Sequence, residues 1–370
     1  MNLFVLSELG HKGSHVGWSV NHSLEETLTE VLNPTLIYPE KIFPLKWLHQ
    51  LGIPEDNLEP FELRLNRLLK HWYKLQHLPT LPQGTNVLLV IGLTPNFLQA
   101  LLTIAPLLKQ FDLRIAYLLD GFKPTWLDPT IATWLDHLFV ISQELATEIS
   151  QISSISTTFL PLGANTTKSY ASGTHRWIDI ISYGRGNEAV HRCLQAHFNQ
   201  GSTERMYFHS TFTTGEVENP REHITLMRKL LSRSKISLCF EASHLSRFNG
   251  HSPLLYRWFE AWAAGCTIVG KQPFEQGVQE LMDWENSTIE IPDSPTDWIP
   301  FFESLLADET TLALNARRNQ QECMLRHDWL YRIKTMLTTV GLPVPEALHD
   351  AITQLQAEAI DTYNVLRLSA

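Results

Sequence analysis

Two residues of opposite charge, Arg257 and Glu260, stand three positions apart in the run YRWFEAWAAG. Side chains three apart are neighbours on a helix surface, so this guanidinium and this carboxylate can point together at a ligand. The polar loop before them supplies further candidate binding residues: Asn249, Gly250, His251 and Ser252. The alternative is that Glu260 is a solvated surface carboxylate, and the pattern alone leaves that alternative open.

A strand, a helix and a second strand must position this pair. Ile236–Phe240 is a short apolar run typical of a strand covered on both faces. Ser252 followed by Pro253 predicts an N-cap with proline at the first helical position. The inward face of the helix is expected to carry Leu255, Trp258 and Trp262. Cys266–Val269 begins another buried strand, so the polar loop lies at a strand's carboxyl end, where open α/β sheets bind ligands.

Composition excludes several classes of protein. With 370 residues the chain suits two domains of ordinary size, and 44% hydrophobic residues indicate a globular protein. A net charge of −10 argues against nucleic acid as a partner, because that role needs a basic surface. The four cysteines show no CxxC spacing, which indicates buried thiols in a reducing compartment. The amino terminus does not resemble a signal peptide, and no apolar run is long enough to span a bilayer, so we expect a cytoplasmic protein.

The run Tyr256–Gly265 resembles the donor-site helix of nucleotide-sugar glycosyltransferases of the GT-B fold. The resemblance is closest to the family 4-like and spore-maturation-type groups, whose pattern is R-x-F-E-A-x-A-x-G before a strand. It implies that Glu260 accepts hydrogen bonds from the ribose of a UDP-sugar or GDP-sugar. Many family 4 members carry a further glutamate eight positions earlier that touches the donor sugar, and here that position is Ser252.

A second stretch of the chain resembles the same enzymes. Ile178–Tyr183 is a predicted strand followed by Gly184 and Arg185. In the family 4-like group such a Gly-Arg pair holds the donor diphosphate, and a guanidinium suits this role because its planar fork binds phosphate oxygens. The lysine usual five residues later is absent, since Val190 occupies its place.

The first loop offers a weaker anion site. A strand, a glycine-containing loop and a helix amino terminus form a plausible cradle for an anion through Gly13, Ser14 and Gly17. The spacing matches neither G-x-G-x-x-G nor the Walker A pattern, and a tight turn is the alternative. Candidate bases for an acceptor hydroxyl are His15, in this loop, and Asp120, at a predicted strand end. The alternative for Asp120 is a turn-forming aspartate before glycine.

Strands and helices alternate in two halves, which predicts an α/β protein with two doubly wound domains. The resemblance implies the GT-B architecture, two Rossmann-like domains facing across a cleft. The segment LPLGAN resembles the passage between these domains. We expect an N-terminal acceptor-side domain at 1–162, a donor domain at 163–340, and a terminal helix at 341–370 that packs back on the first domain. Leu312–Leu337 is expected to form one helix.

The expected activity is hexosyl transfer from a nucleotide diphosphate sugar, which serves as co-substrate with no other cofactor. No D-x-D pair or metal-ligand cluster occurs in the sequence, which favours metal-independent transfer. The family likeness favours retention of stereochemistry. Two alternatives stay open: a catalytically silent GT-B homologue serving as a scaffold subunit, and a nucleotide-sugar epimerase.

The acceptor is not readable from the residues, so a glycan, a lipid, a peptide and a small molecule all stay open. Glu62–Leu78 has helical periodicity with a basic face. Most such faces are solvated surface, and peripheral contact with a membrane is the alternative.

Overall fold

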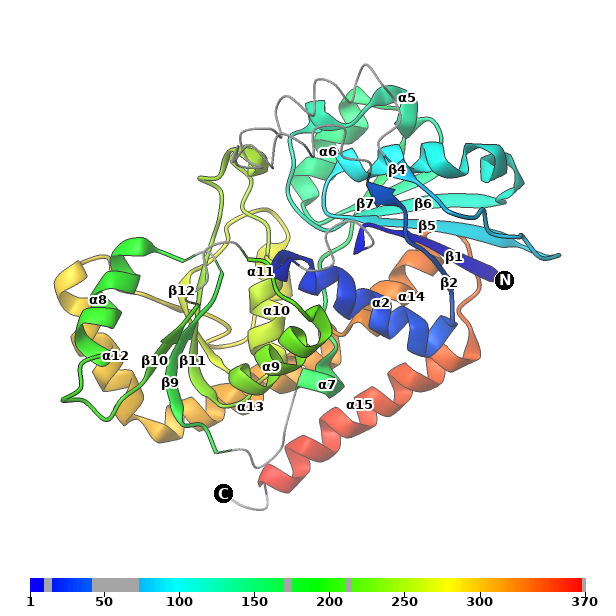
Figure 1. The fold of residues 1–370 in the computed structure, drawn as a ribbon. Helices are drawn as coiled ribbons and strands as arrows, with labels where there is room; N and C mark the ends of the chain where they lie inside the picture. The colour runs from blue at the N-terminus through cyan, green and yellow to red at the C-terminus, as the bar shows by residue number, and fades with distance from the viewer. Residues whose placement is uncertain (10–14, 42–72, 170–174, 185, 211–214, 368–370) are drawn as a thin grey trace. The chain divides into compact units, whose positions relative to one another are not determined.

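The computed structural model describes residues 1–9, 15–41, 73–169, 175–184, 186–210 and 215–367 (Figure 1). By their contacts the residues fall into two compact units. The first unit contains Met1–Gly13, Asn33–Val140 and Leu145–Thr158. The second contains Ser14–Leu32, Ile141–Glu144 and Phe159–Ala370.

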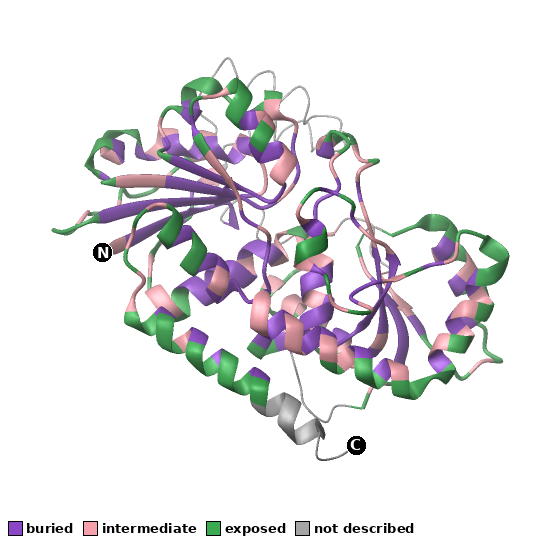
Figure 2. Cartoon of the chain, turned by 180° about the vertical axis from the view of Figure 1, so that it is seen from behind, coloured by how far each residue is buried: buried purple, intermediate pink, exposed green. Residues whose placement is uncertain are grey.

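The first unit is built on a sheet of six strands in the order β2-β1-β5-β6-β7-β8. Their bounds are β1 Asn2–Ser7, β2 Thr35–Ile37, β5 Asn86–Gly92, β6 Leu113–Leu118, β7 His137–Val140 and β8 Ser156–Phe159. The pairs that join β2, β1, β5, β6 and β7 are parallel. All seven residues of β5 are buried, as expected of a strand covered on both faces. Figure 2 shows the middle of this sheet, made largely of β1, β5 and β7, in the colour of buried residues.

Helical segments connect these strands: η2 Pro95–Gln110, η3 Pro124–Trp126, α5 Pro129–Ala132 and α6 Gln143–Ile152. A small antiparallel ribbon joins β3 Glu40–Lys41 to β4 Tyr73–Lys74. The predicted helix at 62–78 is wrong at its end, because residues 73 and 74 pair as a strand and Lys74 forms an ion pair of 3.0 Å with Glu40. Residues 62–72 lie outside the described residues.

The second unit contains a parallel sheet of five strands in the order β10-β9-β11-β12-β13. Their bounds are β9 Ile178–Ser182, β10 Tyr207–His209, β11 Ser234–Phe240, β12 Thr267–Lys271 and β13 Ile289–Glu290. The central strand β11 pairs with β9 and β12, so the carboxyl ends of these three strands share one edge. The two parallel sheets confirm the predicted α/β class.

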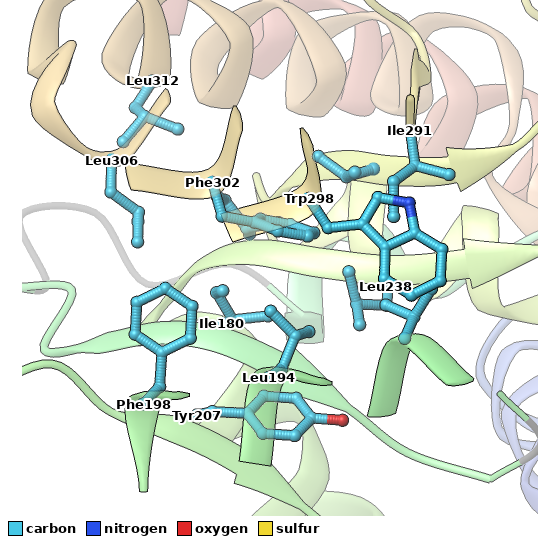
Figure 3. Packing of buried hydrophobic residues seen from close by; sticks show 13 residues of the cluster. Ile180, Leu194, Phe198, Tyr207, Leu238, Ile291, Trp298, Phe302, Leu306 and Leu312 are labelled. Atoms are coloured by element: carbon cyan, nitrogen blue, oxygen red, sulfur yellow. The ribbon is translucent and has the colours of Figure 1, made fainter. Parts of the chain in front are cut away.

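Helices of the second unit pack on this sheet (Figure 1): α8 Glu188–Phe198, α9 Pro220–Leu231, α10 Tyr256–Ala263, α12 Trp298–Ala307 and α13 Glu309–Arg326. The unit also contains α11 Val278–Leu281, α14 Trp329–Thr339 and the short turns η4 Ser246–Phe248 and η5 Pro295–Asp297. A buried apolar cluster joins α8 and α12 to the strands, and Figure 3 shows Leu194 and Phe198 of α8 and Phe302 of α12 lying against Ile180 and Leu238. This packing fixes the strands whose ends carry the candidate site.

Helix α2 Ser19–Leu32 and the turn η1 Val16–Trp18 before it belong to the second unit. The Trp329 Nε1–H donates to Ser23 Oγ at 3.0 Å, and Glu26 accepts from Arg228 at 3.0 Å. The short helix α7 Thr166–Ser169 and the terminal helix α15 Glu346–Arg367 also lie in this unit, and α15 contacts α2, α13 and α14. The domain limits at residues 162 and 340 stay a prediction.

Candidate functional site

Strand β9 ends in a tight turn at Gly184. Its φ of +63° is in the left-handed region, where a side chain is strained. A Cβ atom built on Gly184 would lie 3.0 Å from Arg257 Nη2, so the guanidinium packs directly against this backbone. The Gly184 N–H donates to Ser210 Oγ at 3.4 Å. Arg185 lies outside the described residues.

Helix α10 presents two faces. Trp258 and Trp262 are 1% and 0% exposed, and their indole N–H groups donate to Thr288 Oγ1 and to the Ser287 carbonyl, both at 2.8 Å. The predicted packing face is therefore confirmed for both tryptophans. Arg257 and Glu260 lie on the other flank and are only partly buried.

The predicted start of this helix is wrong. Leu255 occupies the N-cap position and the helix begins at Tyr256, so Ser252 is not an N-cap. The Ser252 hydroxyl instead donates to Glu241 Oε2 at 3.1 Å and accepts the Phe274 N–H at 3.3 Å. These contacts hold the loop in place, and the side chain is fully buried.

Glu260 is surrounded by groups that fix its carboxylate. Tyr183 O–H donates to Glu260 Oε2 at 3.4 Å, and the Arg257 guanidinium lies 5.9 Å from the centre of the Tyr183 ring. Burial raises the pKa of Glu260 to about 7, and the charge of Arg228, the Tyr183 hydrogen bond and the charge of Arg257 oppose this rise. Glu260 is therefore not an ordinary solvated carboxylate.

The loop before α10 has an exposed tip and an inward-facing end. Asn249 and Gly250 are exposed, with φ angles of 54° and 90°. The His251 side chain is 13% exposed, and its Nδ1 lies 3.7 Å from Glu144 Oε2. Of the four predicted loop residues, Asn249 and Gly250 are accessible to a ligand, whereas Ser252 supports the loop from inside.

The first loop is described only from His15 onward, so Gly13 and Ser14 lie outside the described residues. His15 Nδ1 accepts the Gly17 N–H at 2.9 Å and thereby caps η1. Its Nε2 would lie 2.6 Å from a Cβ atom on Gly215, so the imidazole packs against that backbone. While this hydrogen bond holds, the neutral imidazole carries its proton on Nε2, so Nε2 cannot act as a base.

Asp120 belongs to the first unit. Its Oδ1 accepts the Gly121 N–H at 2.9 Å, the contact expected of a turn-forming aspartate. The structure thus brings together Gly184, Arg257 and Glu260, whereas His15 packs against Gly215 and Gly17 lies against the His15 ring.

Sequence reasoning missed Tyr183 and Arg228. Tyr183 precedes the Gly184 turn at a strand end, a position that could have marked it as a candidate. Arg228 reaches the site from α9 and has no sequence signal, since only the packing of α9 brings its charge near Glu260.

In the part of the chain that the structure describes, no three histidine, cysteine, aspartate or glutamate side chains gather in a way that could hold a metal ion. Among the same residues, no helix combines the length and apolar character required to cross a bilayer.

Both the sequence and the structure of the chain resemble known proteins. Residues 191–338, less than half of the chain, match the family model described as glycosyl transferase-like. No curated protein matches the sequence.

Solved structures resemble nearly the whole chain. Anabaena HepE in complex with UDP and glucose has a TM-score of 0.55 at 11% identity, covering 92% of this chain and 99% of its own. The UDP complex of HepE gives a TM-score of 0.53 at 12% identity with the same coverage. The UDP-forming α,α-trehalose-phosphate synthase of Burkholderia vietnamiensis has a TM-score of 0.50 at 10% identity, also covering 92% and 99%.

The architecture is therefore GT-B, with two Rossmann-like parallel sheets. The family-model match in the second half of the chain is to glycosyl transferase-like sequences, which agrees with this fold.

Proposed function

We propose that the protein transfers a sugar from a nucleotide diphosphate donor, with the nucleotide bound at the carboxyl edge of the second sheet. One observation carries the proposal. The Tyr183 hydroxyl, just after β9, donates a hydrogen bond to Glu260 of α10, and the Arg257 guanidinium lies beside the same Tyr183 ring. A carboxylate accepts hydrogen bonds from the two ribose hydroxyls, and a guanidinium binds diphosphate oxygens. UDP is the first nucleotide to test, because the structurally similar HepE was solved in complex with UDP.

We propose that the diphosphate is neutralised by arginine without a divalent ion. Arg257 lies against the Gly184 turn, and Arg185 follows that turn in the sequence. We also propose that transfer retains the stereochemistry, as the resemblance to the family 4-like group implies. Donor turnover is expected to persist in EDTA, and turnover that needs added manganese would contradict the metal-independent route.

Calorimetric titration tests the nucleotide site. Wild-type protein is expected to bind UDP and to bind 2′-deoxy-UDP more weakly. Glu260→Gln removes a charged acceptor, and hydrogen bonds to charged groups contribute about 1.5–3 kcal/mol, so UDP affinity should fall roughly ten- to a hundredfold. The variant should discriminate little between the two ligands.

Glu309→Gln serves as the matched control, because Glu309 is exposed in the first turn of α13. It should bind UDP as the wild type does. Absence of binding of UDP, GDP, ADP and dTDP at millimolar concentration would overturn the proposal. Interconversion of UDP-sugars without an acceptor would point to an epimerase, and nucleotide binding without any turnover would point to a scaffold subunit.

A further inference from the structure

Glu241 is the first residue after the central strand β11. Its N–H donates to the Lys271 carbonyl at 3.1 Å, which continues the pairing with β12. On the other side β11 pairs with β9, whose carboxyl end carries the Gly184 turn. Parallel strands end at a common edge about 4.8 Å apart, so Glu241 lies between the Gly184 turn and the loop after β12.

Two donors fix the orientation of this carboxylate. Glu241 Oε2 accepts the Ser243 N–H at 2.7 Å and the Ser252 O–H at 3.1 Å. Ser252 is itself immobilised, because it is 0% exposed and accepts the Phe274 N–H at 3.3 Å. A carboxylate held through one oxygen in this way loses little further freedom when a ligand binds the other.

The second oxygen is available for a ligand. Among the described residues Glu241 Oε1 makes no hydrogen bond, and the side chain keeps part of its surface exposed. An ionised carboxylate accepts hydrogen bonds and repels phosphate, so its ligand must present donors. In a nucleotide diphosphate sugar, the groups beyond the diphosphate that present such donors are the hydroxyls of the sugar.

We propose that Glu241 binds a hydroxyl of the transferred sugar and that Ser252 is its positioning residue. This inference rests on the proposed function, because it assumes a nucleotide diphosphate at the neighbouring Gly184 turn. It assigns a sugar contact to the end of β11, separate from the nucleotide contacts of Glu260.

Calorimetry with two kinds of ligand tests the assignment: UDP, and whichever of UDP-glucose, UDP-galactose and UDP-N-acetylglucosamine the wild type binds best. Glu241→Gln keeps the shape and removes the charge. It should bind UDP within twofold of the wild type and bind the UDP-hexose about ten- to a hundredfold more weakly. Ser252→Ala should show the same pattern with a loss of about three- to tenfold, and a purely structural role would lower both affinities equally.

Glu309→Gln is the control for loss of one carboxylate, and thermal unfolding reports whether each variant folds. Wild-type binding of UDP together with unchanged UDP-hexose affinity in Glu241→Gln would overturn the assignment and leave the proposed function standing. Equal losses for UDP and UDP-hexose would also overturn it, since the residue would then hold the nucleotide. Failure of the wild type to bind a UDP-hexose or any of UDP, GDP, ADP and dTDP would overturn the proposed function and this assignment together, and binding of another nucleotide alone would move the same comparison to that nucleotide and its hexose derivative.

Discussion

The carboxyl edges of the two sheets use their acidic side chains differently. In the first unit Glu8 Oε2 accepts the Leu93 N–H at 2.6 Å, and Asp120 Oδ1 accepts the Gly121 N–H. In the second unit Glu260 accepts from the Tyr183 hydroxyl, and Glu241 accepts from the Ser252 hydroxyl as well as from one N–H. In each acid of the second unit a hydroxyl group from a separate element orients the carboxylate, as the proposed ligand roles of Glu260 and Glu241 require.

The largest expected effect comes from Gly184→Val. A β-branched residue at φ +63° costs about 1–3 kcal/mol, and its Cβ would displace Arg257. UDP affinity should fall roughly a hundredfold by calorimetry, with a lower melting temperature. Gly201→Val is the control, because no atom lies within 4 Å of a Cβ there. Unchanged UDP binding in Gly184→Val would remove the turn from the site.

The next effect is a pH dependence of UDP binding. Because the pKa of Glu260 is about 7, only about one tenth of the carboxylate is ionised at pH 6. UDP affinity should therefore be about tenfold weaker at pH 6 than at pH 8. The phosphate of UDP titrates in the same range, so the ratio of wild-type to Glu260→Gln affinity is the quantity to follow. A ratio that does not change with pH would contradict an ionised Glu260 as ligand.

The same pKa affects stability in the opposite direction. Folding raises the pKa of Glu260 above its ordinary value of 4.5, so the folded protein binds more protons between pH 4.5 and about 7. The contribution of this group to the free energy of unfolding falls as pH rises through that window. Urea unfolding measures this contribution. The free energy of unfolding of the wild type, relative to that of Glu260→Gln, should be lower at pH 7.5 than at pH 5.

A smaller effect is expected for Tyr183→Phe. The substitution removes one hydrogen bond to Glu260 and keeps the ring beside Arg257. A hydrogen bond contributes about 0.5–1.5 kcal/mol, so UDP affinity should fall roughly two- to tenfold. The loss should be absent when Glu260 is already glutamine, which a double-mutant cycle measures. Additive losses would mean that the two side chains act separately.

The smallest effect is expected in the first unit. Asparagine can accept the Gly121 N–H as aspartate does, so Asp120→Asn should preserve the turn. UDP affinity and the rate of UDP-sugar turnover should stay within twofold of the wild type. A tenfold or greater loss of rate with unchanged UDP affinity would restore Asp120 as a catalytic base and end the contrast between the two edges.

Strands and the inward face of α10 were predictable because apolar periodicity determines them directly. The start of α10 was not predictable from the local sequence. Ser252 forms hydrogen bonds with Glu241 and Phe274, which are distant in sequence, and it does not cap the helix. The predicted single helix at 312–337 divides into α13 and α14. Asp328 accepts the Leu330 N–H and the Thr166 N–H, both at 2.9 Å, and so starts a new helix.

The candidate site was predictable in part. Motif resemblance found Gly184, Arg257 and Glu260, which the structure brings together. It did not point to Tyr183 or Glu241, although both stand at the end of a predicted strand, and it could not find Arg228, whose charge comes near Glu260 only through the packing of α9. Arg185 stays a prediction, because it lies outside the described residues.

Helix α10 has only eight residues, and five of them are buried: Trp258, Phe259, Ala261, Trp262 and Ala263. Of the other three, Tyr256 stacks on Trp329 with ring centres 6.4 Å apart, and the remaining two are Arg257 and Glu260. Six of the eight positions therefore pack against other residues, and the remaining two are the pair proposed to bind the nucleotide. If that proposal holds, nearly every substitution in this helix should cost either stability or binding, so sequences related to this protein should vary less here than on its exposed surfaces.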